Sequence, residues 1–110
     1  MKQAALLLLL LLSAAAPALA QYEGPAVETC RAYARRELVL NHDDATDVVF
    51  KHDQNLTIER YTRKVGSQFV SSVLMGSGAL LQDGKPGPDL PFICLLANEK
   101  RAVFFYWLPP

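Results

Sequence analysis

Hydrophobic positions in the first part of the chain beyond residue 24 repeat with the period of an α-helix. Between Ala26 and Leu40, apolar residues recur every three to four positions and include Val27, Cys30 and Leu38. Gly24-Pro25 immediately precedes this stretch, and proline is favoured at the first position of a helix. The pattern predicts one amphipathic helix with Cys30 on its inward face.

The pattern changes to a period of two after the polar turn at residues 41–44, which is typical of β-strands. We expect five strands joined by short turns, at residues 47–51, 56–63, 68–81, 92–97 and 101–108. Residues 56–63 alternate as a half-buried strand does, and residues 82–91, with their glycines and prolines, are expected to form a loop. A helix followed by consecutive strands predicts an α+β fold, with one N-terminal helix packed on an antiparallel sheet of about five strands.

The N-terminal residues have the organisation of a secretory signal. Lys2 is followed by the leucine run Leu6–Leu12 and by Ala18-Leu19-Ala20, a pattern that signal peptidases cleave. We therefore expect residues 1–20 to be a cleaved signal peptide and residues 21–110 to form a single domain. The apolar stretch is shorter than the roughly 20 residues that span a bilayer, so no membrane span is expected.

Export would place the two cysteines of the chain, Cys30 and Cys94, in an oxidising compartment. In an oxidising compartment such a pair most simply forms a disulfide, whereas two isolated cysteines make a poor zinc site. A free thiol, a metal site and a redox pair are the alternatives. The arrangement predicts a disulfide that ties the helix to the sheet.

The charge of the chain argues against nucleic acid as a partner. Without residues 1–20, which contain Lys2, ten basic and eleven acidic side chains remain, a net charge of −1. Nucleic-acid-binding domains normally carry a basic excess or a basic stripe.

Two groups of residues could take part in chemistry, namely the acidic residues and histidines of the polar turns, and the serines. Acidic residues and histidines gather in the two polar turns and could bind a cation or act as acid–base groups: His42, Asp43, Asp44, Asp47, His52 and Asp53. Their spacing fits no calcium loop, and the favoured interpretation is two polar turns that flank a short strand. The serines lie in no G-x-S-x-G motif. We expect no catalytic residue, no metal and no cofactor, and hence no enzyme.

The aromatic segment Val103–Leu108 is the main candidate for function. It could be a central strand covered on both faces, or a strand whose exposed face binds a protein, an apolar ligand or a second copy of the chain. Arg60 and Arg63, beside Tyr61, could contact an anionic group or could simply be solvated. The expected interaction surface comprises Phe104, Tyr106, Trp107, Arg60, Arg63 and Ser77.

Ser77 lies in the segment Gly76-Ser77-Gly78, which interrupts the strand pattern. Glycines at such a place indicate a bulge or a close approach of the backbone to a neighbour.

Three segments, Cys30–Ala34, Glu59–Ser72 and Phe92–Phe105, resemble small exported bacterial proteins of unknown function. The likeness covers most of the chain beyond residue 20; it implies a periplasmic or secreted location and brings no activity.

Gly76–Leu80 is similar to the serine–glycine loop with which periplasmic inhibitors of C-type lysozyme enter the enzyme cleft. That resemblance implies Ser77 as a loop contact, but leucines stand where those inhibitors have a tyrosine, and their Trp-x-Lys-Gly stretch is missing. The sequence therefore favours a non-enzymatic binding protein of the bacterial envelope. An inhibitor of a secreted hydrolase such as lysozyme, or a small hydrolase, are the alternatives.

Overall fold

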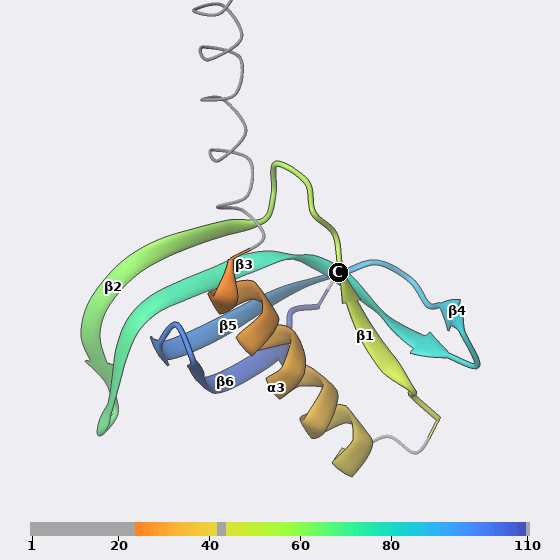
Figure 1. The fold of residues 1–110 in the computed structure, drawn as a ribbon, viewed down its shortest axis with the longest axis horizontal. Helices are drawn as coiled ribbons and strands as arrows, with labels where there is room; N and C mark the ends of the chain where they lie inside the picture. The colour runs from red at the N-terminus through yellow and green to blue at the C-terminus, as the bar shows by residue number, and fades with distance from the viewer. Residues whose placement is uncertain (1–23, 42–43, 110) are drawn as a thin grey trace, which may run out of the picture.

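A computed structural model describes residues 24–41 and 44–109, which form one helix and one antiparallel sheet (Figure 1). Helix α3 (Pro25–Asn41) comes first and confirms the predicted helix. The strands follow in the order β1 (Asp47–Phe50), β2 (Thr57–Val65), β3 (Gln68–Gln82), β4 (Lys85–Pro86), β5 (Leu90–Asn98) and β6 (Arg101–Trp107). The predicted α+β fold is thus confirmed, with six strands where the sequence indicated about five.

The additional strand, β4, lies in the segment that was expected to be a loop. Leu81 pairs with Pro86 and Gln82 with Lys85, so the end of β3 and β4 form a short hairpin. Asp83 and Gly84, at its tip, both have positive φ angles, of 52° and 76°. Asp-Gly is a preferred sequence for a two-residue hairpin turn with that backbone conformation.

The long strand β3 organises the sheet. The strand order is β1-β3-β5-β6, and β2 and β4 also pair with β3. β2 pairs with residues 68–75 of β3 and β1 pairs with residues 78–81, so these two strands follow one another along β3. β6 pairs only with β5 and therefore forms an edge of the sheet among the described residues.

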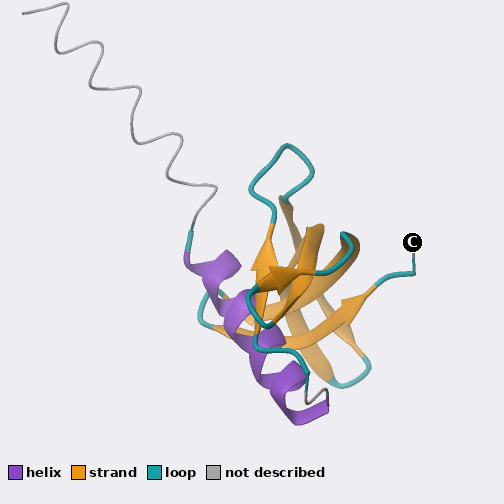
Figure 2. Ribbon diagram, turned by 90° about the vertical axis from the view of Figure 1, so that its right-hand side faces the viewer, coloured by secondary structure: helices purple, strands orange, loops and turns teal. Residues whose placement is uncertain are grey.

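Helix α3 lies against one face of the sheet (Figure 2). Its buried side chains are those of the predicted apolar stripe, Ala26, Val27, Cys30, Ala34 and Leu38. They meet alternate residues of the strands: Val48, Phe50, Leu74, Phe92, Cys94 and Leu96. This layer between helix and sheet is the hydrophobic core.

A disulfide crosses this core. Cys30 of α3 and Cys94 of β5 are bonded, and neither is exposed to solvent. Their Cα atoms are 6.2 Å apart, within the range usual for disulfides, and the two residues are 64 positions apart in the sequence. Closing so long a loop stabilises the fold by about 4 kcal/mol on the chain-entropy model.

Two glycines of β3 make room for a cluster of aromatic rings. A Cβ atom at Gly78 would lie 2.5 Å from the Val49 carbonyl oxygen, and one at Gly76 would lie 2.9 Å from Leu56 Cδ1. The close backbone approach expected at Gly76-Ser77-Gly78 is therefore present, and β3 runs through it without a break.

The rings over these glycines come from three different strands. Phe50 of β1 stacks on Phe92 of β5 at 4.2 Å between ring centroids and on Phe105 of β6 at 5.9 Å. Trp107 packs edge-on against Phe105 at 5.0 Å. Because β1 and β6 stand at opposite ends of the strand order, this contact shows that the sheet curves around its core.

The expectation that residues 56–63 form a half-buried strand was wrong. Leu56 is buried, but all nine residues of β2 are exposed. Figure 1 shows the reason, because the β2–β3 hairpin curves away beyond α3, β5 and β6, so no second layer covers β2.

The disulfide should contribute strongly to stability. We expect Cys30→Ala/Cys94→Ala to lower the free energy of unfolding by about 4 kcal/mol, since the unfolded chain regains the closed loop. Alanine is preferable to serine because it adds no buried hydroxyl that lacks a partner. Urea unfolding with and without dithiothreitol measures the effect. A midpoint of the unmodified protein that does not change on reduction would contradict it.

Gly78 should tolerate no side chain. We expect Gly78→Ala to cost about 2 kcal/mol or more, because the methyl group would collide with the backbone of β1. Gly87→Ala is the matched control, because a Cβ atom there would lie 3.4 Å from the Leu80 carbonyl oxygen, an ordinary contact. Equal urea midpoints for the two variants would show that β1 does not lie against β3 at this point.

Candidate interaction surface

The face of the sheet away from α3 carries two rows of apolar side chains. The strand register aligns Val73 with Leu95 and Phe104, and Met75 with Ile93 and Tyr106. These residues alternate with the core residues along each strand and so point away from the helix. We call this surface the open face and define it by these six residues together with Phe69, which lies on the same side of β3.

The open face exposes large apolar groups. Phe104 is 45% exposed and Tyr106 55%, and their rings stack at 6.2 Å between centroids. Phe69 is 47% exposed and Met75 43%. Exposed apolar groups gathered on one face, rather than scattered singly, are typical of interaction sites.

The last strand therefore divides its aromatic residues between the two faces. Phe104 and Tyr106 lie on the open face, while Phe105 and Trp107 pack against the core under α3. The interpretation of Val103–Leu108 as a central strand covered on both faces is wrong, because β6 is an edge strand and Phe104 and Tyr106 are exposed. Trp107, which we expected on the same surface as Tyr106, points to the other side of the sheet because side chains alternate along a strand.

The two arginines of the expected surface lie elsewhere. Arg60 is opposite Ser72 and Arg63 opposite Val70, on the side of β3 that faces the helix. Between them the register shifts, and Thr62 has a φ angle of 51°, so β2 carries a bulge here. Both arginines are exposed, and neither forms an ion pair with a described residue.

Ser77 lies inside β3 and not in a loop. Its carbonyl oxygen accepts a hydrogen bond from the Lys51 amide at 2.8 Å, and its register partner in β5 is Pro91. By alternation its side chain shares the side of the open face. Of the six residues expected at the surface, the structure thus brings Phe104, Tyr106 and Ser77 to one side of the sheet.

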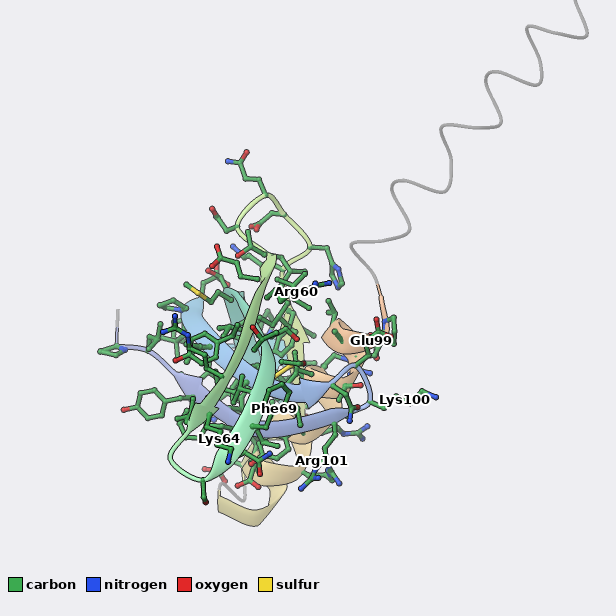
Figure 3. All side chains as sticks on the ribbon, turned by 90° about the vertical axis from the view of Figure 1, so that its left-hand side faces the viewer. Arg60, Lys64, Phe69, Glu99, Lys100 and Arg101 are labelled. Atoms are coloured by element: carbon green, nitrogen blue, oxygen red, sulfur yellow. A yellow bond between two sulfur atoms is a disulfide. The ribbon has the colours of Figure 1, made fainter. Side chains whose placement is uncertain are left out.

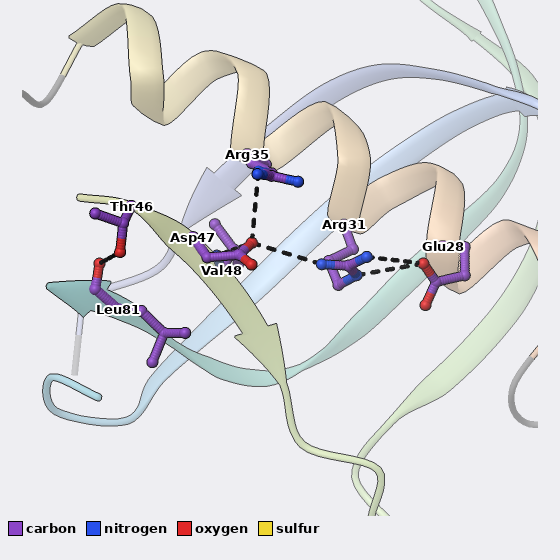
Figure 4. Close-up of polar contacts among 7 residues, drawn as sticks. All are labelled: Glu28, Arg31, Arg35, Thr46, Asp47, Val48 and Leu81. Atoms are coloured by element: carbon purple, nitrogen blue, oxygen red, sulfur yellow. Dashed lines mark hydrogen bonds and ion pairs between the residues drawn. The ribbon is translucent and has the colours of Figure 1, made fainter. Parts of the chain in front are cut away.

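The acidic residue Asp47 has a structural role (Figure 4). Its carboxylate accepts a hydrogen bond from the Val48 amide at 2.7 Å and lies 3.5 Å from Arg31 and 3.7 Å from Arg35. Arg31 also pairs with Glu28 at 3.1 Å. These contacts join α3 to β1.

The other members of the expected polar cluster do not assemble with Asp47 into a site that can be described. His42 and Asp43 lie outside the described residues. Within residues 24–41 and 44–109, no group of three or more histidine, cysteine, aspartate or glutamate residues could hold a metal ion.

A separate ion pair connects two loops at the end of the sheet opposite the β2–β3 turn. Lys51, just after β1, pairs with Asp89, just before β5. The hydrogen bond and the negative charge of Asp89 raise the pKa of Lys51 above its usual value. Both side chains are about half exposed, so the pair contributes little to stability.

A groove that sequence analysis missed runs between α3 and β6. It has a volume of about 440 Å³ and is lined by Tyr33, Ala34, Glu37 and Leu38 of the helix and by residues 104–107 of the strand. The Tyr33 hydroxyl donates a hydrogen bond to the Val103 carbonyl at 3.4 Å near one end. Periodicity could not reveal this groove, because it depends on where the helix crosses the sheet.

Trp107, one of the lining residues, has a polar atom without a partner in the described part of the chain. Trp107 Nε1 is buried and has no hydrogen-bond acceptor among the described residues. A buried donor without an acceptor costs about 1–3 kcal/mol.

No helix in the described part of the chain is long and apolar enough to cross a membrane. Comparison of the sequence and the structure with models of protein families, with curated proteins and with solved structures gave no match.

Proposed function

We propose that this chain is a non-enzymatic binding protein of the bacterial envelope, and that the open face is its interaction surface. The observation that carries the proposal is the exposure of Phe104 and Tyr106 beside the aligned rows of apolar residues. In the described part of the chain one helix covers one side of this sheet (Figure 2), and the other side carries the apolar residues of the open face. Such an area favours association with another molecule, because covering it removes apolar surface from water.

The chemistry of the open face suits a protein interface. Tyrosine, phenylalanine and methionine are enriched at interface centres, and all three are exposed here. Tyr106 combines a large apolar ring with a hydroxyl that can form a hydrogen bond, which is a frequent property of residues that dominate binding energy. The partner that fits is therefore a protein with an apolar patch of its own.

The disulfide supports the location. A buried disulfide between Cys30 and Cys94 suits an oxidising compartment such as the periplasm or the extracellular medium. The signal pattern of residues 1–20 is an independent reason to propose export.

Removing the exposed rings should abolish binding without unfolding the protein. We expect the double variant Phe104→Ser/Tyr106→Ser to capture at least ten times less partner than the unmodified protein when each is cross-linked in the native bacterium. Its melting temperature should stay within about 4 °C of the unmodified protein, because changes at exposed positions usually cost little.

Ile58→Ser is the matched control for this experiment. Ile58 is 54% exposed, but it lies opposite Leu74 on the helix side of the sheet, so its removal should not affect capture. The proposal fails if the double variant captures the same partner as efficiently as Ile58→Ser. It also fails if the melting temperature of the double variant falls steeply, since Phe104 and Tyr106 would then belong to the core.

A further inference from the structure

The hydrogen-bond pattern of β6 shows which of its backbone groups face outward. The Leu108 amide donates to the Pro91 carbonyl at 2.8 Å, so these residues form a hydrogen-bonded pair. In an antiparallel ladder such pairs alternate with pairs that share no hydrogen bond. The register continues without a shift from Phe92↔Trp107 to Leu95↔Phe104. It follows that Tyr106 and Phe104 bond to β5, while the amides and carbonyls of Phe105 and Trp107 point away from the sheet.

These outward groups form an open edge. β6 has no second neighbouring strand among the described residues, and on its outer side the Tyr33 hydroxyl donates a hydrogen bond to the Val103 carbonyl. Residues 102–107 contain neither a proline nor a charge, two of the features that natural proteins use to block an exposed edge. A bulge, a third such feature, is confined to the Arg101 end of the strand, where the register with β5 shifts between Leu95 and Asn98. An unblocked edge of this kind is the usual template for the addition of another strand.

The side chains of a strand added at this edge would meet a surface of the protein on both faces of the sheet. Side chains of an added strand would alternate between the helix side and the open face. On the helix side they would meet the groove between α3 and β6, which is lined by Tyr33, Leu38 and Trp107. On the other side they would lie beside Phe104 and Tyr106.

The charged residues near the start of β6 indicate which kind of molecule supplies the added strand. Arg101 begins β6 and Lys100 immediately precedes it, and Arg36 of α3 stands over the Tyr33 ring nearby (Figure 3 shows Lys100 and Arg101). Neither Lys100 nor Arg101 has an ion-pair partner among the described residues, and Glu99 is the one acid of the turn. The other end of the strand, at Leu108 and Pro109, is uncharged.

The β6 strand of a second copy fits this edge poorly. β6 contains no acidic residue, so two β6 strands paired with each other would leave Arg101 without an opposite charge on the added strand. A partner strand with an acidic residue beside Arg101 would remove this deficit, since opposite charges across neighbouring strands are favourable.

We propose that β6 and the groove between α3 and β6 bind an extended peptide segment of a partner protein by strand addition. That segment alternates apolar and polar residues and places an acidic side chain beside Arg101. The inference rests on the proposed function and specifies the partner and its mode of binding.

A phage-displayed library of random linear decapeptides provides the probe. The oxidised protein is the target, and the selected peptides are synthesised and titrated into ¹⁵N-labelled protein. We expect selected sequences with alternating apolar residues and an acid near one end. Binding should slow hydrogen exchange of the Phe105 and Trp107 amides at least tenfold, because these two amides would then be hydrogen-bonded.

Charge reversal at Arg101 tests whether an acidic residue of the peptide lies beside this arginine. Arg101→Glu should weaken binding of the same peptides at least tenfold. Arg63→Glu is the matched control, because Arg63 is an exposed arginine on β2, away from the β6 edge, and its reversal should change affinity less than twofold.

Several results would overturn strand addition. One is a selection that yields no peptide, and another is a set of selected peptides that bind without changing hydrogen exchange at Phe105 and Trp107. A third is equal weakening of binding by the two charge reversals. A fourth is a dimer, seen by sedimentation, in which the same two amides are protected. A peptide that shifts only the Phe104 and Tyr106 resonances would overturn strand addition while supporting the open face as a binding surface. The capture experiment with Phe104→Ser/Tyr106→Ser tests that surface separately, so failure of strand addition can be distinguished from failure of the proposed function.

Discussion

The fold depends on the contact between one helix and one face of a curved sheet. The apolar stripe of α3 meets alternate residues of β1, β3 and β5, and the bond between Cys30 and Cys94 fixes the helix at the centre of this contact. A sheet has two faces, however, and the described part of the chain contains only one helix to cover them. The exposure of Phe104, Tyr106 and Met75 is thus a direct consequence of how the core is built.

Curvature of the sheet makes this arrangement possible in a short chain. The missing side chains at Gly76 and Gly78 let Phe50, Phe92 and Trp107 lie close to the backbone of β3. Rings from the two ends of the strand order therefore meet in one cluster, which fills the core beside the helix. The same curvature carries the β2–β3 hairpin beyond the helix and leaves β2 exposed along its whole length.

Local signals in the sequence predicted much of this fold. The period of the apolar residues placed α3 and the strands, and the two cysteines indicated a disulfide between helix and sheet, which the structure confirms. The candidate site was predicted less well. Alternation within β6 implies that Tyr106 and Trp107 face opposite ways, but sequence alone did not reveal which of them meets the helix. The edge position of β6 and the groove beside α3 depend on strand order and helix placement, which are tertiary properties and leave no periodic signal.

The proposed function requires the open face to be exposed to solvent in the folded, oxidised protein. Hydroxyl-radical footprinting of dilute protein, read by mass spectrometry, tests it directly by comparing residues of the same type. The account predicts fast oxidation of Phe69 and Phe104, and slow oxidation of Phe92, which is 1% exposed. Protection of Phe104 equal to that of Phe92 would contradict it, since the face away from α3 would then be covered within the protein itself.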